Sequence, residues 1–572
     1  MLDHLITGAT IVDGSGAAPR RGDVGVRGGR IVVVGTAEEG ARTTLDGDGL
    51  MVAPGFIDPH THYDAQLFWD PQATPSNVHG VTTVIGGNCG FTLAPLHAAD
   101  ADYTRRMMAR VEGMPLAALE DGVRWSWESF AEYLDRLEGN IGVNAGFLVG
   151  HCALRRYVMG AESVGAEATP AQVEEMGRVL HESLAAGGLG FSTTRSGTHS
   201  DGDGEAVASR WASTEELIRL CQVTGEHAGT TLEAIVQGCL DGFSDDEMEL
   251  LADMSVAARR PVNWNVLTVD ARSPQRVERQ LSASTLARQR GGRIVALTMP
   301  ALVPMNMSFL NFCALFLIPG WGDVLNLPVP ERMRQLSDPA VRAEMMRRAS
   351  TEEAGVFRNV ANFRHYVIGD TYSAANEGLR GKVVGQLADE QGRDPFDVVA
   401  ELVVNDELRT ILWPMPPDND PATWELRRRV WEDDRAMLGG SDAGAHLDRM
   451  CGAPYTTRFI GDMLRGRQLV AVEEAVRLIT DVPAQLLGLV GRGRIAEGNH
   501  ADLVVFDPAT VGSEPASLVA DLPGGSARLT ADSIGVVRVL VNGVETVADG
   551  RSTGAIPGTV LRSGVHTRTV EP

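Results

Sequence analysis

The sequence comprises 572 residues, of which 44% are hydrophobic and 22% are charged, a globular balance that argues against long disordered tracts. Its formal net charge of −24 disfavours nucleic acid as a partner. The longest nearly apolar stretch, Phe309–Ile318, is interrupted by Asn311 and is much shorter than the roughly 20 residues that span a bilayer. We interpret this stretch as buried core or as a wall of a substrate pocket, with attachment to a membrane surface as the weaker alternative.

The first residues and the cysteines indicate the compartment. Met1–Gly16 includes Asp3 and His4 and lacks both a basic leader and an apolar run, so we expect a cytoplasmic protein. The six cysteines lie far apart without a C-x-x-C pair, which fits buried thiols in a reducing compartment. We expect a small-molecule substrate and no membrane partner, and the sequence leaves open whether the chain forms a homo-oligomer.

Both ends of the chain show the pattern of β-structure. The predicted strands are Leu5–Val12, a hairpin over Asp23–Val34, Ala501–Phe506, and a second hairpin formed by Ile534–Val541 and Val544–Val547. The hairpins turn at Gly28-Gly29 and Asn542-Gly543. We therefore predict a small composite β-sandwich domain from residues 1–53 and 489–572.

Between these ends, short apolar strands alternate with helical patterns. The predicted strands are Thr82–Gly86, Ala145–Gly150, Gly190–Thr193, Thr231–Val236, Pro261–Leu267, Arg293–Leu297 and Ala436–Gly440, and the predicted helices include Ala171–Ala186, Ser213–Thr224 and Val472–Asp481. This alternation indicates an α/β fold with parallel strands, and about eight units fit a (β/α)8 TIM-like barrel over residues 54–488. Residues from about 303 to 434 exceed the number that eight such units need, and we predict that they form a helical insertion above the carboxyl ends of the barrel strands.

Two histidines follow the first expected barrel strand. His60 and His62 are spaced i, i+2, so in an extended chain both imidazoles face the same side and can bind one metal ion. Asp58 and Asp64 flank the pair, and we expect their carboxylates to orient the ring nitrogens. The alternative is a chance His-x-His in a surface loop, which the apolar strand before it and the neighbouring acids disfavour.

Two later strand ends carry further candidates. Cys89 lies at the mouth of the second barrel strand, where a thiolate is a good zinc donor, with a buried inert thiol as the alternative. Asp442 follows the last barrel strand in a glycine-rich segment and is the candidate for a metal ligand that also takes a proton from water. The alternative for Asp442 is an Asx-turn residue. His446 could contact substrate or shuttle that proton.

These segments together resemble the amidohydrolase superfamily, and more closely the N-acyl-D-amino-acid deacylases, over most of the chain. The segments that carry the resemblance are Ala53–Asp64, Gly87–Gly90, Gly150–Arg155, Gly188–Ser192 and Ala496–Val504. The resemblance implies a barrel with a composite sandwich, zinc, and hydrolysis of an amide next to a D-configured carbon. It assigns His60, His62 and Asp442 to one ion and gives Cys89 as a ligand that reaches a second.

The chain departs from this family on two middle strands, where the family carries histidines. The corresponding strands contain Glu233 on one and Asn263 and Asn265 on the other. Glu233 can bind zinc through oxygen, whereas an asparagine is a weak ligand, and we assign Asn263 to the substrate site. The sequence therefore predicts one or two zinc ions.

The same departure removes a family lysine that is expected to hold substrate. Arg195 is a candidate replacement, because a guanidinium pairs with a carboxylate through two hydrogen bonds, and a structural ion pair is the alternative. His151 is a candidate for the substrate site or a core histidine. His199 lies in a polar loop and is expected to be exposed to solvent.

The predicted reaction is hydrolysis of an N-acyl-D-amino acid to a D-amino acid and a carboxylate. Asp442 would deprotonate a zinc-bound water and return the proton to the leaving amine. The alternatives are a related amidohydrolase acting on a cyclic amide or another C–N bond, and an inactive scaffold protein on the same fold. The sequence does not indicate the acyl group or the amino-acid side chain.

Overall fold

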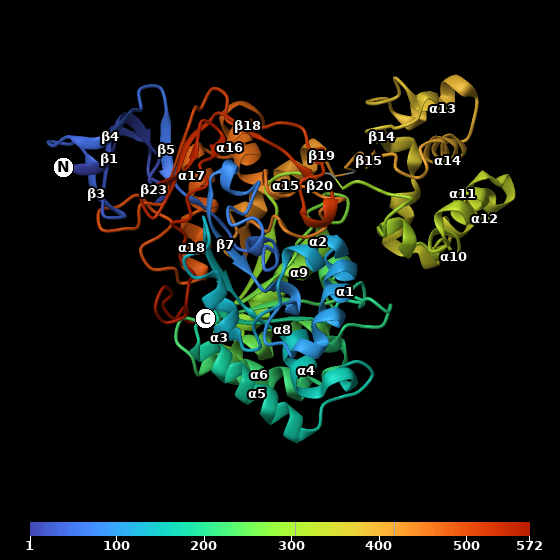
Figure 1. Cartoon of the computed structure of the whole chain (residues 1–572), viewed down its shortest axis with the longest axis horizontal. Coiled ribbons are helices and arrows are strands. Elements are labelled where there is room, and N and C mark those ends of the chain that lie inside the picture. Colours follow the sequence, from blue (N-terminus) through green and yellow to red (C-terminus); the bar gives the residue numbers. More distant parts are fainter. Residues whose placement is uncertain (304, 417) are drawn as a thin grey trace. The chain divides into compact units, whose positions relative to one another are not determined.

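The computed structural model describes residues 1–303, 305–416 and 418–572 (Figure 1). The chain divides into two compact units. The first comprises Met1–Ala301, Asp420–Leu447 and Gly452–Pro572, and the second comprises Leu302–Asn419 and Asp448–Cys451. The domain bounds expected from the sequence differ from these and stay a prediction.

Parallel strands form the centre of the first unit. One sheet orders β6 (Phe56–Asp58), β7 (Val81–Gly86) and β8 (Asn144–Phe147). A six-stranded sheet orders β9 (Val149–Gly150), β10 (Gly190–Thr194), β11 (Thr231–Ile235), β12 (Val262–Trp264), β13 (Ile294–Thr298) and β16 (Ala436–Leu438). All strand pairs within these two sheets are parallel.

The two sheets join at both edges. Only Leu148 separates β8 from β9, and its N–H donates to the Gly86 carbonyl. At the other edge, Asp442 N–H donates to the His60 carbonyl and His62 N–H donates to the Ala443 carbonyl, which ties the end of β16 to the end of β6. With β8 and β9 counted as one interrupted strand, eight strands close on themselves, and the predicted (β/α)8 barrel is confirmed.

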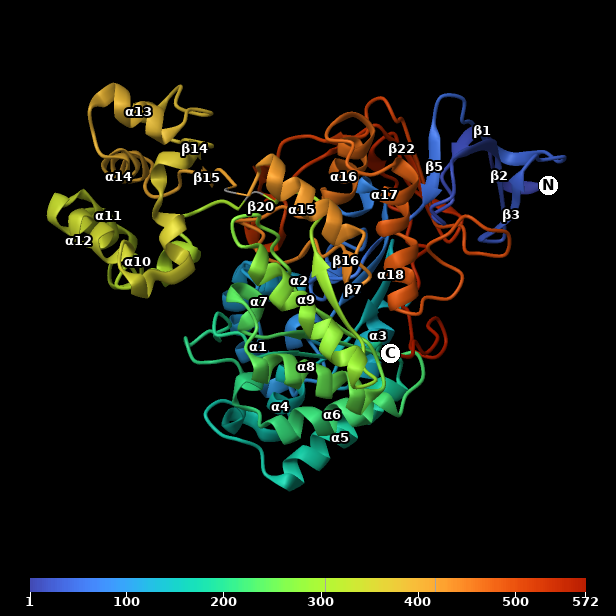
Figure 2. The ribbon, with the colours of Figure 1, turned by 180° about the vertical axis from the view of Figure 1, so that it is seen from behind.

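Helices cover the outside of this barrel (Figure 2). Capping side chains open two of the predicted helices: Thr169 and Gln172 form a capping box at α5 (Pro170–Ala185), and Ser213 accepts the Glu216 N–H at α6 (Thr214–Gly225). The expected helix over 472–481 is instead divided into α17 (Val472–Leu478) and α18 (Asp481–Leu486). The other long helices of this unit are α1 (Ala101–Val111), α2 (Leu116–Gly122), α3 (Phe130–Leu137), α4 (His151–Met159), α8 (Asp245–Ala258), α9 (Pro274–Gln289), α15 (Pro421–Trp431) and α16 (Tyr455–Arg465).

Both chain ends contribute to one nine-stranded sheet. The N-terminal strands are β1 (Leu2–Ile11), β2 (Arg20–Arg27), β3 (Arg30–Gly35), β4 (Ala41–Asp46) and β5 (Met51–Pro54), and the C-terminal strands are β17 (Leu503–Phe506), β22 (Val536–Val541), β23 (Val544–Ala548) and β24 (Arg551–Ser552). β5 pairs antiparallel with β17, and Val24, Val52, Leu503 and Val505 share one buried cluster. The predicted composite β-structure is therefore confirmed.

The second unit is mostly helical and has its own core. Its main elements are α11 (Val329–Ser337), α12 (Pro339–Ala349), α13 (Val384–Gln391), α14 (Pro395–Asn405) and the pair β14 (Tyr366–Ile368) and β15 (Leu412–Pro414). Phe309, Leu315 and Ile318 are buried beside Trp321 in the core of this unit. The interpretation of the apolar stretch as core is thus confirmed. Within the described ranges, no helix is long and apolar enough to cross a membrane.

His79, just before β7, joins the barrel to the C-terminal region through both ring nitrogens. Its Nε2–H donates to the Ala531 carbonyl at 3.0 Å, and its Nδ1 lies 2.7 Å from the Thr457 hydroxyl. The residue is fully buried, and burial lowers the pKa of His79 to about 4 from 6.5. Because the unfolded chain binds this proton below its ordinary pKa and the folded chain does not, the stabilising contribution falls as pH falls from 6.5 towards 4.

We expect this imbalance to remove about 2 kcal/mol of unfolding free energy between about pH 7.5 and about pH 5. Urea unfolding of the wild type and of His79→Gln at both pH values measures the contribution, because glutamine does not titrate. The wild type should lose more stability than the variant by that amount. Equal losses in the two proteins would contradict the assignment.

Candidate metal centre

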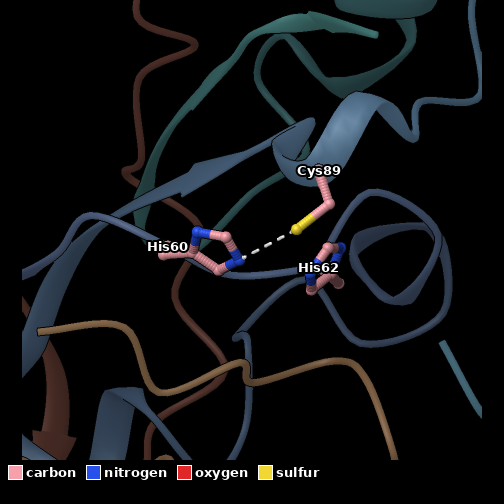
Figure 3. A group of neighbouring side chains, drawn as sticks. All are labelled: His60, His62 and Cys89. Carbon is pink, nitrogen blue, oxygen red and sulfur yellow. Dashed lines mark hydrogen bonds between the residues drawn. The ribbon is translucent and has the colours of Figure 1, made fainter. Parts of the chain in front are cut away.

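The two histidines after β6 and the cysteine after β7 lie together in the barrel. Suitable ligand atoms of His60, His62 and Cys89 all lie within 4.8 Å of one another, and all three residues are buried (Figure 3). The Cys89 Sγ lies 3.6 Å from the His60 Nε2. Two adjacent strand ends thus supply three soft or borderline donors to one small region, as a zinc site requires.

Asp442 completes this group from the end of β16. Its Oδ1 lies 3.1 Å from the His62 Nε2 and 3.5 Å from the His60 Nε2, while its Oδ2 lies 3.6 Å from the His446 Nε2. Ligand atoms around a tetrahedral zinc ion lie about 3.3–3.6 Å apart, with the longer value for a nitrogen and a sulfur atom. The distances from Asp442 to the two imidazoles, and from Cys89 to His60, therefore each fit neighbouring ligands of a zinc ion.

The backbone after β16 bends sharply to place this carboxylate. Asp442 itself has a positive φ of 58°, and Gly444 has a φ of 93°. A Cβ atom at Gly444 would collide with the His62 carbonyl oxygen. The glycine lets this segment approach the His60–His62 segment closely.

Glu233 and Asn265 lie on the Cys89 side of the centre. Glu233, on β11, accepts the Cys89 N–H through Oε2 at 2.7 Å, and its Oε1 is buried without a hydrogen-bond partner among the described residues. The Asn265 Nδ2 lies 3.5 Å from the Cys89 Sγ. Asn263 pairs in register with Glu233, and its Oδ1 is also buried without a partner in the described part of the chain. These orphaned oxygens fit a site that receives a cation or a polar ligand.

A further carboxylate at this centre, Glu112, was not predicted from the sequence. It follows α1 in the long βα connection after β7, is 3% exposed, and places Oε2 3.6 Å from the His62 Nε2. Its carbonyl oxygen accepts the His446 N–H. Neither strand periodicity nor a metal-ligand spacing marks this residue in the sequence, because a long-range contact brings it to the centre.

The ionisable groups of this centre shift one another's pKa values. Burial penalises the His62 cation, but the carboxylates of Glu112 and Asp442 outweigh this penalty and raise the pKa of His62 to about 10. Burial alone would raise the pKa of Asp442, yet hydrogen bonds from His60 and His62 hold the pKa of this carboxyl well below its usual range. Burial raises the pKa of Glu233 to about 8. Protons and a metal cation therefore compete for the same side chains.

The expected role of the flanking acids is wrong. The Asp58 Oδ1 accepts the backbone N–H groups of His60 and Ser441, and the Asp64 Oδ2 accepts the Gly87 N–H. Within the described residues, Nδ1 of His60 and Nδ1 of His62 have no hydrogen-bond partner. These two carboxylates orient the backbone around the centre and leave the imidazole rings unrestrained by hydrogen bonds at Nδ1.

Comparison with known proteins identifies the family. The amidohydrolase family model matches residues 43–553. A D-aminoacylase of Alcaligenes xylosoxydans xylosoxydans is 30% identical over 570 residues, which cover 98% of this chain and 97% of the relative. The chain belongs to the amidohydrolase family, in its D-aminoacylase branch. As an amidohydrolase, it is an enzyme that hydrolyses amide C–N bonds.

Two solved structures of this branch cover 98% of this chain and their own chains completely. One is a D-aminoacylase with a binuclear metal centre, with 26% identity and a TM-score of 0.62. The other is an N-acyl-D-glutamate deacylase of Bordetella bronchiseptica complexed with zinc and a phosphonate inhibitor, with 25% identity and a TM-score of 0.62. Both therefore share the fold of this amidohydrolase over its whole length.

Arg195 and His151, two candidates for the substrate site of the amidohydrolase, make contacts with residues other than the proposed metal ligands. Arg195 donates to the Ala212 carbonyl and lines an open groove whose other charged residues are the acids Asp246, Glu247, Glu249 and Asp253. Its assignment to a substrate carboxylate gains no support from these contacts and stays a prediction. His151 is buried, with one ring nitrogen on Thr193 and the other on Glu216, which also pairs with Arg155. This network fits the core-histidine alternative.

His199 is closer to the centre of this amidohydrolase than expected. The residue is half-buried, its Nδ1 lies 2.8 Å from the Thr194 hydroxyl, and its ring packs against Phe91 at 5.3 Å between centroids. Burial and the charges of His446 and His62 lower the pKa of His199 to about 3. The expectation of a solvent-exposed His199 is therefore wrong.

Proposed function

We propose that this amidohydrolase hydrolyses N-acyl-D-amino acids with zinc bound by His60, His62, Cys89, Asp442 and Glu233. The observation that carries this proposal is the position of Asp442, whose Oδ1 faces both imidazoles while its Oδ2 faces His446. One carboxylate thereby serves the metal side and the proton-transfer side of the centre. Similarity over the full chain to a D-aminoacylase and to an N-acyl-D-glutamate deacylase supports the substrate class.

Zinc would supply a Lewis acid that polarises the amide carbonyl and acidifies water. Asp442 takes the proton from the attacking water and delivers it to the leaving amine nitrogen, so the amide C–N bond breaks as the new C–O bond is retained. His446 lies beside the Asp442 Oδ2 and can hold or exchange that proton. Burial of His60, His62 and Glu233 strengthens the charge interactions of these side chains.

The number of metal ions depends on which ligands lie next to Cys89. Cys89 and Glu233 provide a thiolate and a carboxylate for a second ion, whereas Asn263 and Asn265 add only weak amide donors. The D-aminoacylase of similar fold has a binuclear centre for which one metal activates and the second attenuates. We therefore propose one tightly held ion and, at most, a weaker second one.

A substrate panel with metal analysis tests this function. Purified protein is assayed with N-acetyl-D-amino acids of apolar, acidic and polar side chain, with their L-enantiomers, and with lactams and hydantoins. We expect hydrolysis of D-substrates only, and zinc close to one ion per chain. Hydrolysis confined to the cyclic amides would overturn the proposed substrate class, and a chain that binds no zinc and hydrolyses nothing would be an inactive scaffold.

A further inference from the structure

Cys89 lies in a turn whose backbone conformation is uncommon for a cysteine. The turn follows β7, and Cys89 has a φ of 55° between Gly87 and Gly90, whose φ values are 73° and 79°. Glycine tolerates this left-handed region, whereas a residue with a Cβ atom adopts it only at a cost in energy. Such a residue persists where the surrounding structure holds it, so the contacts of this turn determine where the Cys89 thiol lies.

Ser192, on β10, holds this turn through two backbone groups. Its hydroxyl donates to the Gly87 carbonyl and accepts the Gly90 N–H at 3.0 Å. The side chain is fully buried, so the two hydrogen bonds form away from bulk water, where they are worth more than at the surface. One hydroxyl group thus fixes the backbone on both sides of Cys89.

Glu233 holds the same turn from the next strand. Ser192 and Glu233 are register partners on β10 and β11, and the Glu233 Oε2 accepts the Cys89 N–H at 2.7 Å. The two side chains together bind the Gly87 carbonyl and the N–H groups of Cys89 and Gly90. Three backbone groups within four residues are therefore fixed by two neighbouring strands of the barrel.

The strand that carries Ser192 is itself fixed by a buried network. Thr193 follows Ser192, and its hydroxyl lies 2.9 Å from the His151 Nδ1. The His151 Nε2 contacts Glu216 at 2.8 Å, and Glu216 also pairs with Arg155. Because all of these side chains are buried, the network restricts the movement of β10 and gives Ser192 a firm base.

The position of the turn decides what the Cys89 thiol can reach. With the turn held in this way, the Cys89 Sγ lies 3.6 Å from the His60 Nε2, and it belongs to the group of ligand atoms with His60 and His62 (Figure 3). Side chains that hold a metal ligand in place contribute to metal affinity although they do not touch the ion. The hydroxyl that fixes this turn meets that description.

From these contacts we propose that Ser192 is a positioning residue of the metal centre, which fixes the turn and thereby aims the Cys89 thiolate at the ion. Ser192 acts through Cys89 and is not itself a ligand. The inference rests on the proposed metal centre, with Cys89 as a ligand, but not on the identity of the substrate.

Cobalt titration of the metal-free full-length protein tests this role without an activity assay. A cobalt ion bound by a thiolate shows a sulfur-to-metal charge-transfer band, and its absence in Cys89→Ala identifies the band as that of Cys89. In Ser192→Ala we expect the cobalt concentration at half-maximal band intensity to rise by about 10- to 100-fold, the usual loss when a residue behind a metal ligand is removed. A wild-type titration curve in Ser192→Ala would overturn the proposal.

The matched control is Ser183→Ala on α5. This serine is also buried, but its hydroxyl donates to the Val179 carbonyl of the same helix. Ser183→Ala should therefore give the wild-type band at wild-type cobalt concentrations. Ser192→Thr keeps the hydroxyl and should also titrate like the wild type, whereas a loss as large as that in Ser192→Ala would contradict a role of the hydroxyl. Thermal unfolding of the metal-free variants checks that each of them is folded before titration.

A double-mutant cycle separates positioning from a general weakening of the structure. Zinc affinity is measured for the wild type, Ser192→Ala, Cys89→Ala and the double variant. Because Ser192 acts through Cys89, Ser192→Ala should lower zinc affinity in the wild type but leave that of Cys89→Ala unchanged. Equal losses in the two backgrounds would show a structural effect that does not pass through Cys89, and would overturn the proposal.

The same measurements keep this inference apart from the proposed substrate. If cobalt gives no thiolate band in the wild type, the assignment of Cys89 as a ligand and this inference fail together. If the cobalt and zinc results are as expected but no N-acyl-D-amino acid is hydrolysed, the substrate proposal fails and this inference stands.

Discussion

Asp442→Asn should lower the hydrolytic rate by about 1,000-fold or more, because asparagine keeps the shape of the side chain but cannot take a proton from water. The loss corresponds to about 4 kcal/mol of transition-state stabilisation. Hydrogen bonds from His60 and His62 outweigh burial and hold the pKa of Asp442 low, so its carboxylate is unprotonated and free to accept the proton. Turnover and zinc content are measured on the same samples with zinc in excess.

The matched control is Asp246→Asn on α8, an exposed acid of the same unit, which should retain the wild-type rate. A wild-type rate for zinc-loaded Asp442→Asn would remove Asp442 from the proton-transfer step. A normal rate in the control and a low rate with full zinc content in Asp442→Asn would separate proton transfer from metal binding.

His62→Ala should lose zinc and activity together. The His62 Nε2 lies 3.1 Å from the Asp442 Oδ1 and 3.6 Å from the Glu112 Oε2, so the variant removes one of the two imidazoles of the proposed metal site. We expect zinc affinity to fall by about 100-fold or more, and turnover to be undetectable at zinc concentrations that saturate the wild type. Equilibrium dialysis followed by metal analysis gives the affinity.

His181→Ala provides the comparison for this variant, because that histidine is 56% exposed on α5 of the same unit. It should bind zinc and turn over like the wild type. Full zinc occupancy and turnover in His62→Ala would show that the His60–His62 pair is not the metal site.

The barrel and the strand-end positions could be predicted because they depend on local patterns. A short apolar run followed by glycine and then by Cys89 or Asp442 marks the carboxyl end of a buried parallel strand, where ligands gather. His60 and His62 could be singled out from their i, i+2 spacing directly after an apolar strand. These residues need no knowledge of distant contacts to be recognised.

Glu112 and the flanking aspartates show where local patterns fail. Glu112 reaches the centre through long-range contacts, among them the hydrogen bond that the His446 N–H donates to its carbonyl. Asp58 has the right spacing to reach an imidazole, yet backbone N–H groups of His60 and Ser441 occupy one of its oxygens. The sequence does not show this competition between backbone and side-chain partners.

The prediction that His199 is exposed to solvent was wrong for a related reason. The loop that carries it is rich in serine, glycine and aspartate, a composition typical of solvent-exposed turns. The loop nevertheless returns His199 to the Thr194 hydroxyl and the Phe91 ring. Composition indicated the exposed part of the loop but not its inward-facing side chains, which include His199 and Asp201.

Because β5 pairs with β17, the N-terminal sheet can be completed only late in the synthesis of the chain. During synthesis, β5 emerges from the ribosome long before β17 (Leu503–Phe506), so the nascent N-terminal sheet keeps an unpaired edge until nearly all of the 572 residues have been made. The barrel strands, which lie between β5 and β17 in the sequence, can pair with one another during this time. The N-terminal sheet stays incomplete until β17 has been made. A ribosome that stops before β17 therefore releases a chain with an open, aggregation-prone edge, and chaperones would have to protect that edge until translation ends.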